Sequence, residues 1–422
     1  MKNGKSWYKL DNAGRLYSST ISSRATTLFR VSATLTSTVD QAILQQALEA
    51  TLERFPFLQV QLKKGFFWYY FEETNEIPEV SEEIYYPCMS LSIRRRGTFP
   101  FCVLYYKKRI AVEFSHSLTD GTAALKFLTE LIIQYLNLKE SLPVKNVTVN
   151  EEQLKAETED GFQKYYEKDI PPLTHSLENA YKLPIKIDDQ GVYHITTGII
   201  DVKSLKQKAK EYKVSISIFL TAVYIDVLLN IQKSANQQKK PVVINVPVNM
   251  RAFFPSLTMR NFFVSITPSV DPRLGEYQFT EVLAEVKHEF NRLLSPKKLK
   301  QYIKMNVKRE KSLFLRMIPL PIKDLIAPFI YSIFGEKQYT SGLSNLGIAN
   351  VPNGVQPFIE RFECYPPPSI GNKVKAMMIS YKDHTYISFG SLSKNRILER
   401  EFFRRLRKLG MNIKIETNTE GS

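Results

Sequence analysis

Three residues in the first third of the chain have types and a spacing that could support catalysis. His116 is followed four residues later by Asp120 and then by Gly121. A neutral imidazole can take a proton from a hydroxyl or amine while that group attacks a thioester carbonyl. Asp120 could brace the loop by pairing with a cation elsewhere in the chain, and Gly121 permits a tight turn or close packing. The spacing therefore indicates a general base at His116.

The same residues also have a purely structural interpretation, in which a satisfied core histidine precedes an aspartate that caps a helix. The His-x-x-x-Asp-Gly string alone does not decide between the two. A hydrolase triad is disfavoured because Ser115 and His116 are adjacent and point to opposite strand faces, and no Gly-x-Ser-x-Gly string occurs. The sequence also contains no phosphate-binding loop and no dinucleotide-binding fingerprint.

His116 is expected at the end of a strand, where the chain turns into a helix. Apolar residues alternate along the strand at Ile110, Val112 and Phe114. His116 continues this alternation, so its side chain is expected on the same face. The helix after Asp120 has an apolar face formed by Ala124, Leu128, Leu131 and Tyr135. Reactive groups are often presented at such strand–loop–helix junctions.

The pattern of strand, helix and further strands occurs twice along the chain. A strand is predicted at residues 28–35, before a helix whose capping box spans residues 38–41, and an aromatic strand at 66–71. A similar order of elements is predicted again later in the chain, with a strand at residues 193–200, a short helix at 202–212 and a mostly apolar helix at 217–231.

A polar segment at residues 139–190 separates the two repeats and is the best linker candidate. We therefore predict an α/β (α+β) protein with two similar lobes. The N-terminal lobe, residues 1–175, contains the His-x-x-x-Asp-Gly string, and the C-terminal lobe comprises residues 176–422.

Residues 114–121 (FSHSLTDG) resemble the signature of the chloramphenicol acetyltransferase-like superfamily. This superfamily includes alcohol acetyltransferases, plant-type acyl-CoA acyltransferases and the condensation domains of peptide synthetases. Further similar stretches follow in the expected order over most of the chain: residues 54–58 with 65–68, 246–251 with 260–263, and 344–347. The alcohol acetyltransferase branch is the most similar.

The resemblance implies two lobes of one fold with an active-site tunnel between them. His116 would be the base, and Asp120 would pair with an arginine, for which Arg251 is the best match. Ser344 or Asn345 would help to hold the tunnel or the oxyanion. Arg251, Ser344 and Asn345 each have an alternative interpretation as a turn or surface residue.

The sequence departs from the superfamily pattern in two places. Condensation domains have a second histidine directly before the catalytic one, and here that position is Ser115. This disfavours a condensation domain without excluding an acyl-carrier-protein thioester as the donor. The late Asp-Phe-Gly-Trp-Gly string of the plant-type enzymes is also missing, which disfavours that branch.

The leading functional interpretation is an acyl-CoA-dependent O- or N-acyltransferase. It would move an acyl group, acetyl being one option, from coenzyme A to a small-molecule alcohol or amine. No permanently bound cofactor and no metal site are expected, and acyl-CoA would be a co-substrate. Two alternatives stay open: the same chemistry with an acyl carrier protein as donor, and a non-catalytic binding or scaffold protein of the same fold.

The charge of the chain bears on its partners. Its 422 residues include 58 Lys and Arg against 42 Asp and Glu, for a formal net charge of +16. A basic surface suits the phosphates of coenzyme A, an acidic carrier protein or an anionic membrane. The last predicted helix carries Arg396, Arg400, Arg404 and Arg407 and is a candidate for peripheral membrane contact. Nucleic-acid binding would rest on charge alone and is not expected.

Cysteine use and the N-terminal sequence indicate a cytoplasmic location. The three Cys form no C-x-x-C pair, so zinc and thiol-redox spacings are absent. Scattered thiols suggest a reducing compartment, and the start of the chain lacks the apolar core of a signal peptide. No membrane span is expected, because the best candidate, residues 313–334, is broken by charges and prolines. One chain would supply both lobes, so a monomer is expected.

Overall fold

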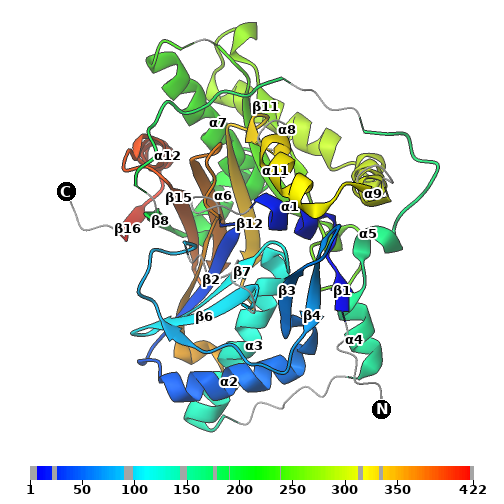
Figure 1. Ribbon diagram of the computed structural model, residues 1–422. Helices are drawn as coiled ribbons and strands as arrows, with labels where there is room; N and C mark the ends of the chain where they lie inside the picture. Colours follow the sequence, from blue (N-terminus) through cyan, green and yellow to red (C-terminus); the bar gives the residue numbers. More distant parts are fainter. Residues whose placement is uncertain are drawn as a thin grey trace.

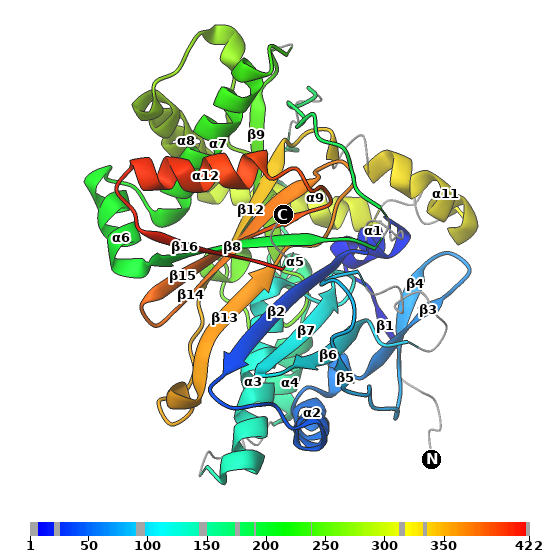
Figure 2. The same ribbon diagram turned by 90° about the vertical axis from the view of Figure 1, so that its left-hand side faces the viewer.

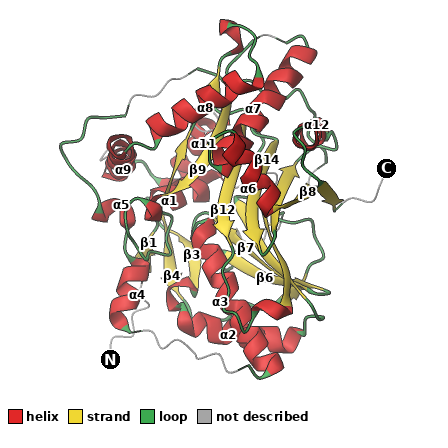
Figure 3. Ribbon diagram, turned by 180° about the vertical axis from the view of Figure 1, so that it is seen from behind, coloured by secondary structure: helices red, strands yellow, loops and turns green. Residues whose placement is uncertain are grey.

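The computed structural model describes residues 7–20, 26–89, 98–142, 150–173, 178–189, 191–237, 239–311, 317–331 and 336–418. Two lobes, each built around a sheet, lie one above the other, and helices cover their outer faces (Figures 1 and 3). The mixed α/β class and the two-lobed arrangement predicted from the sequence are confirmed.

The sheet of the first lobe carries the strand that leads to His116. Its order is β13 (Ile359–Tyr365), β2 (Leu28–Leu35), β7 (Arg109–Ser115), β6 (Phe101–Tyr106) and β5 (Ser81–Glu82). Neighbours are antiparallel except β5 and β6. Helices α2 (Gln41–Arg54) and α3 (Gly121–Glu140) pack together beneath the sheet (Figure 2). The strand predicted at residues 28–35 is β2.

The second sheet forms the frame of the other lobe. Its order is β10 (Phe263–Ile266), β9 (Val242–Asn249), β12 (Ser341–Ile348), β14 (Val374–Tyr381), β15 (His384–Ser391), β8 (His194–Asp201) and β16 (Ile413–Thr417), and β11 (Ser269–Val270) also pairs with β9. Its helices are α6 (Val202–Glu211), α7 (Ile216–Ser234), α8 (Phe279–Leu293) and α12 (Ile397–Lys408).

The two faces of the second sheet have different partners. Along β14, Ala376 and Met378 belong to the core shared with α7 and α8. Met377 and Ile379 belong instead to the core of the first lobe. Because side chains alternate along a strand, one face of this sheet meets its own helices and the other face meets the first lobe. The face of β14 toward the first lobe therefore also includes Lys375.

A small third sheet lies at one side of the molecule, in the order β1 (Trp7–Lys9), β4 (Tyr69–Glu73) and β3 (Val60–Lys64). Four helices accompany it: α1 (Asn12–Thr20), α5 (Gly161–Lys164), α9 (Pro296–Lys311) and α11 (Leu320–Tyr331). Helix α1 packs against both α9 and α11. The strand predicted at residues 66–71 begins instead at Tyr69, because the N–H of Gly65 donates to the carbonyl of Trp68 (3.0 Å) and closes a turn.

The segment predicted to be a linker, residues 139–190, contains α4 (Glu151–Thr158) and α5. Glu157 of α4 is buried and pairs with Arg54 (2.6 Å) and Lys126 (2.7 Å). The high charge that suggested a linker is thus partly used in a buried ion-pair cluster. The division at residue 175 remains a prediction, although β13, far beyond that point, pairs with β2 in the first sheet.

Two local predictions need correction or qualification. Helix α2 is capped by Asp40, which accepts from the N–H of Ile43 (3.0 Å), and not by Thr38, because the helix begins only at Gln41. Among the described residues, one helix, α7, is long enough and apolar enough to cross a membrane, and 67% of that apolar stretch is buried. Its apolar composition is accounted for by packing in the second core. The basic run at residues 94–96 lies outside the described residues.

Candidate active site

The turn after β7 fixes the position of His116. The backbone N–H of His116 donates to the carbonyl of Thr27 (3.2 Å). The N–H of Leu118 donates to the carbonyl of Ser115 (2.9 Å), and the hydroxyl of Ser117 donates to that of Ser115 (2.8 Å). Ser115 therefore serves the turn, and β7 ends with His116 held at the junction with α3, as the sequence predicts.

The imidazole of His116 is half-buried among aromatic rings from three separate elements. Its centroid lies 5.1 Å from the Tyr17 ring of α1, 4.3 Å from the Phe29 ring of β2 and 5.9 Å from the Phe263 ring of β10. Its Nδ1 atom is buried and has no hydrogen-bond partner within the described part of the chain. The ring therefore lies where the two lobes meet.

Burial makes His116 a neutral group near pH 7. Removal of the ring from water lowers the pKa of His116 to about 4, and the nearby positive charge of Lys375 lowers it further. The negative charge of Asp120 acts in the opposite direction. Because desolvation is the largest of these effects, the ring is deprotonated at neutral pH and can accept a proton.

Asp120 joins the two lobes. Its Oδ2 accepts from Nη1 of Arg251 (2.7 Å) and from the backbone N–H of Phe262 (2.9 Å). Its Oδ1 accepts from the backbone N–H of Ala123 (3.1 Å), which caps α3. The pairing of Asp120 with Arg251 implied by the resemblance is present. Both carboxylate oxygens are engaged, so Asp120 holds the structure around His116.

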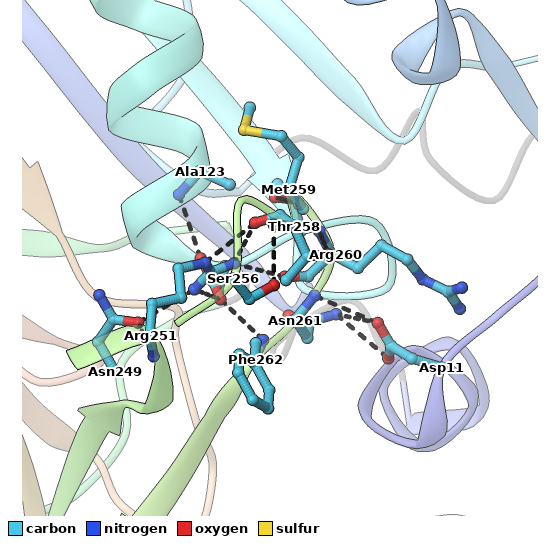
Figure 4. Close-up of polar contacts among 12 residues, drawn as sticks. Asp11, Ala123, Asn249, Arg251, Ser256, Thr258, Met259, Arg260, Asn261 and Phe262 are labelled. Atoms are coloured by element: carbon cyan, nitrogen blue, oxygen red, sulfur yellow. Dashed lines mark hydrogen bonds and ion pairs between the residues drawn. The ribbon is translucent and has the colours of Figure 1, made fainter. Parts of the chain in front are cut away.

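Arg251 is itself fixed by the loop before β10. Its guanidinium donates to the carbonyls of Thr258 (2.8 and 3.0 Å) and Arg260 (2.7 Å), in addition to Asp120 (Figure 4). The side chains of Asp120 and Arg251 are only 6% and 12% exposed. This cross-lobe pair is therefore shielded from water, and its geometry is set from both sides.

Asn261 completes this arrangement and was not singled out in the sequence. Its Nδ2 donates to the carbonyl of His116 (3.0 Å) and to Asp11 at the start of α1 (3.0 Å), as Figure 4 shows for Asp11. Asp11 also accepts from the N–H of Gly14 (2.7 Å). Burial raises the pKa of Asp11 to about 6. Asn261 thus ties the His116 turn to the helix that carries Tyr17, across distances in sequence that no local pattern reveals.

Ser344 and Asn345 lie on β12, and their neighbours place them on opposite faces. Ser344 pairs in register with Met377, which packs on the first lobe. Asn345 points the other way: its Nδ2 donates to the hydroxyl of Ser217 (3.0 Å) at the start of α7. Its Oδ1 accepts from the N–H of Gly347 (2.8 Å). Only Ser344 is on the face that turns toward the lobe carrying His116.

A basic pocket lies on the other side of β12, with a volume of about 880 Å³. Asn345 and Gly347 line it, together with the beginning of α7. Six lysines also line it: Lys203, Lys206, Lys210, Lys213, Lys287 and Lys382. No aspartate or glutamate is among its described lining residues. The arrangement favours a ligand that carries several negative charges.

Comparisons with proteins of known structure identify the fold of this chain. No model of a known protein family matches the sequence, and no curated protein is similar to it in sequence. Solved structures match over nearly the whole chain. The trichothecene 15-O-acetyltransferase TRI3 from Fusarium sporotrichioides has a TM-score of 0.62 at 10% identity, covering 95% of this chain and 94% of its own.

Two further structures agree with the first. TRI101 from F. graminearum, solved with coenzyme A and deoxynivalenol, has a TM-score of 0.62 at 11% identity, with 96% and 97% coverage. The first condensation domain of the calcium-dependent antibiotic synthetase has a TM-score of 0.59 at 12% identity, with 96% coverage of both chains. This chain has the condensation-domain and acetyltransferase fold. At these identities the likeness concerns the fold, which confirms the architecture implied by the sequence resemblance.

In this fold the glycine after Asp120 has a steric role that a substitution can test. A Cβ at Gly121 would lie 2.6 Å from Cδ2 of Leu346 on β12. We expect Gly121→Ala to cost up to about 2 kcal/mol of stability, because overpacking of about 1–3 kcal/mol is partly offset by the roughly 1 kcal/mol by which alanine favours a helix. Urea unfolding measures this cost. In a Leu346→Ala background the cost of Gly121→Ala should be smaller, whereas an equal cost in both backgrounds would contradict the contact.

The acidic limb of the pH–rate profile should report the pKa of His116. If His116 is the base, activity should stay level from pH 8 to about 5 and fall as the pH approaches the pKa of about 4. Lys375→Met removes a neighbouring positive charge, so the pKa of His116 should rise and the acidic limb should move to higher pH. Lys414→Met, at a mostly exposed position on β16, is the matched control. Identical profiles for the wild type and Lys375→Met would contradict this.

Proposed function

We propose that the protein is an acyltransferase that moves an acyl group from an acyl-CoA thioester to an alcohol or amine, with His116 as the general base. The environment of the His116 ring carries the proposal. The ring is neutral, half-buried between the lobes and oriented by three aromatic side chains. With Nδ1 buried, Nε2 is the nitrogen that we assign to the acceptor.

The proposed reaction has two proton transfers. Nε2 takes the proton from the acceptor O–H or N–H while the acceptor atom attacks the thioester carbonyl carbon. The new C–O or C–N bond forms, the C–S bond breaks, and the leaving thiolate takes the proton back from the imidazolium. The products are an ester or amide and a free thiol. Ser344 is the better candidate for the oxyanion, because the amide of Asn345 is already bound to Ser217 and Gly347.

The basic pocket is the proposed site for the coenzyme A phosphates. Its lysines offer charge-assisted hydrogen bonds, and β12 separates it from the face that carries Ser344. The tunnel between the lobes that the sequence resemblance implies would have to connect the basic pocket with the face of β12 that carries Ser344. The structure of TRI101 was solved with coenzyme A, which supports the choice of donor by analogy of fold.

Substitution of the pocket lysines tests the donor site. The double variant Lys206→Ala and Lys210→Ala should raise the KM for acyl-CoA by about three- to tenfold at low salt with little change in kcat, because each lost charge-assisted bond weakens ground-state binding. Steady-state kinetics at two salt concentrations measure this, with Lys408→Ala on α12 as an exposed control outside the pocket. A fall in kcat with unchanged KM would contradict a donor-binding role.

A carrier-protein donor is the second candidate, because the same lysines would suit an acidic carrier protein. Condensation domains share the fold, which keeps this candidate open. Parallel assays with an acyl-CoA and with the same acyl group on a carrier protein decide between them. A kcat/KM much higher for the carrier-bound donor would replace coenzyme A in the proposal and leave the role of His116 unchanged.

A further inference from the structure

An exposed apolar surface lies beside the small third sheet, far from the basic pocket. Phe66 and Phe67 form the tip of the β3–β4 hairpin and are 72% and 42% exposed. Met317, just before α11, is 76% exposed, and on α11 Ile322, Leu325 and Ile326 are 47%, 80% and 40% exposed. Figure 2 shows α11 just above the β3–β4 hairpin, at the right-hand edge of the molecule. We call these six residues the apolar edge.

The polar residues of α11 hold the helix against the hairpin. The N–H of Leu320 donates to the carbonyl of Phe66 (2.9 Å), and Nζ of Lys323 donates to that of Phe67 (2.8 Å). Asp324 accepts from Lys64 (3.0 Å) and from the Tyr69 hydroxyl (2.9 Å). Lys323 and Asp324 of α11 are thus bound to the hairpin and Leu320 is buried, whereas the side chains of Ile322, Leu325 and Ile326 are exposed to solvent. Exposed apolar side chains gathered in this way on the hairpin and on α11 mark an interaction site.

The aromatic side chains near the apolar edge favour a lipid surface over a protein partner. Of the 2 Trp, Trp68 lies in the hairpin beside Phe67, whereas Trp7 on β1 pairs with Glu72, toward the end of β4 away from the hairpin tip. Trp7 is 59% exposed, and Lys323 lies over the Trp68 ring at 3.3 Å. Indole rings and lysines beside exposed aliphatic side chains are the composition found at membrane–water interfaces.

Charge favours anionic lipid. Helices α9 and α11 both pack against α1, and eight residues link Lys311 at the end of α9 to the start of α11. Its sequence, PKKLKQYIKMNVKREK, contains one acidic residue among many basic ones. Lys297 and Lys308 on this helix are exposed. A basic helix that packs on the same helix, α1, as α11 suits a bilayer whose headgroups are negatively charged.

The last helix, the candidate chosen from the sequence, is less suitable. The apolar side chains of α12, including Phe402 and Leu406, are buried in the second core. Its arginines are partly engaged: Arg405 pairs with Asp226 (2.8 Å) and Arg404 with Glu401 (3.0 Å). Helix α12 can thus offer charge to a membrane but no apolar surface to insert.

We propose that the protein docks on anionic lipid bilayers through the apolar edge, with the β3–β4 hairpin and α11 entering the headgroup region. This docking does not depend on the chemistry proposed at His116, although the docking surface and His116 are connected through helix α1. Helix α1 packs on α11, and its Tyr17 stacks on the His116 ring. An apolar acceptor dissolved in the bilayer would then meet the protein close to α1.

Vesicle binding tests the proposal. Full-length protein is mixed with vesicles of phosphatidylcholine alone or with added phosphatidylserine, and sedimentation is followed together with tryptophan emission. Wild type should bind the phosphatidylserine vesicles more tightly, with a blue shift because Trp68 lies in the docking hairpin. The double variant Phe66→Ser and Leu325→Ser should lose at least tenfold in affinity, since two large apolar side chains would no longer be buried in the headgroup region.

A matched control is available in Leu274, which is 80% exposed on a different surface. Leu274→Ser should bind vesicles as wild type does. Equal binding of the double variant and wild type would overturn the proposal. So would a wild-type dimer in solution that the double variant converts to a monomer without any vesicle binding, because the apolar edge would then be covered by a second copy of the chain.

Discussion

Replacement of His116 by alanine is expected to lower acyl transfer by about 10²–10⁴-fold while the protein stays folded. The bond from Asn261 goes to the backbone carbonyl of His116, which alanine retains. The Asp120–Arg251 pair is also unaffected. The loss should therefore appear in kcat, with the unfolding midpoint lowered only by the loss of ring packing. Steady-state kinetics with urea unfolding of the same samples measure both.

The control for this variant is His384→Ala. His384 is exposed at the start of β15, in the hairpin with β14, and takes part in none of the contacts around His116. It should retain full activity. If His116→Ala transferred acyl groups at the wild-type rate, the ring would have to be a structural core residue, which is the alternative interpretation of the His-x-x-x-Asp-Gly string.

Loss of the Asp120 carboxylate should have the largest effect on stability. Asp120→Ala leaves the positive charge of Arg251 without its ion-pair partner, and the N–H of Phe262 without its acceptor, in a site shielded from water. Removing one partner of a buried pair costs about 3–5 kcal/mol. Because this pair joins the lobes, activity should fall as well. Urea unfolding and activity assays measure the two effects.

A double-mutant cycle isolates the pair. Arg251→Met together with Asp120→Ala should cost clearly less than the sum of the single changes, since neither variant side chain leaves a buried charge. Glu276→Ala, which removes an exposed partner of Lys233, should leave the unfolding midpoint almost unchanged. Additive costs in the cycle, or a fully stable and active Asp120→Ala protein, would contradict a cross-lobe role for the pair.

Helices and strands whose local pattern of apolar residues determines them could be predicted from the sequence. The alternation at residues 28–35 and 110–114 predicts β2 and β7, and the apolar run from 217 predicts α7, because burial on one face or on all sides sets these patterns. The predicted cap of α2 and the predicted start of β4 were each wrong by a few residues. There, one side-chain bond from Asp40 and one turn at Gly65 decide the boundary.

Features formed by distant residues could not be predicted in the same way. Asn261 contacts Asp11 and His116, which are 250 and 145 positions away in sequence. The opposite directions of Ser344 and Asn345 depend on the register of β12 with β14. The pairing of Asp120 with Arg251, by contrast, was expected because the resemblance supplied it. The roles of these residues in catalysis remain predictions.

The central claim is tested most directly by the release of free thiol. Purified protein is mixed with acetyl-CoA or longer acyl-CoAs and a panel of alcohols and amines, and thiol release is followed while products are identified by mass. The account predicts release that depends on the acceptor, produces the matching ester or amide, and is lost in the folded His116→Ala protein. Equal release by wild type and His116→Ala would contradict it.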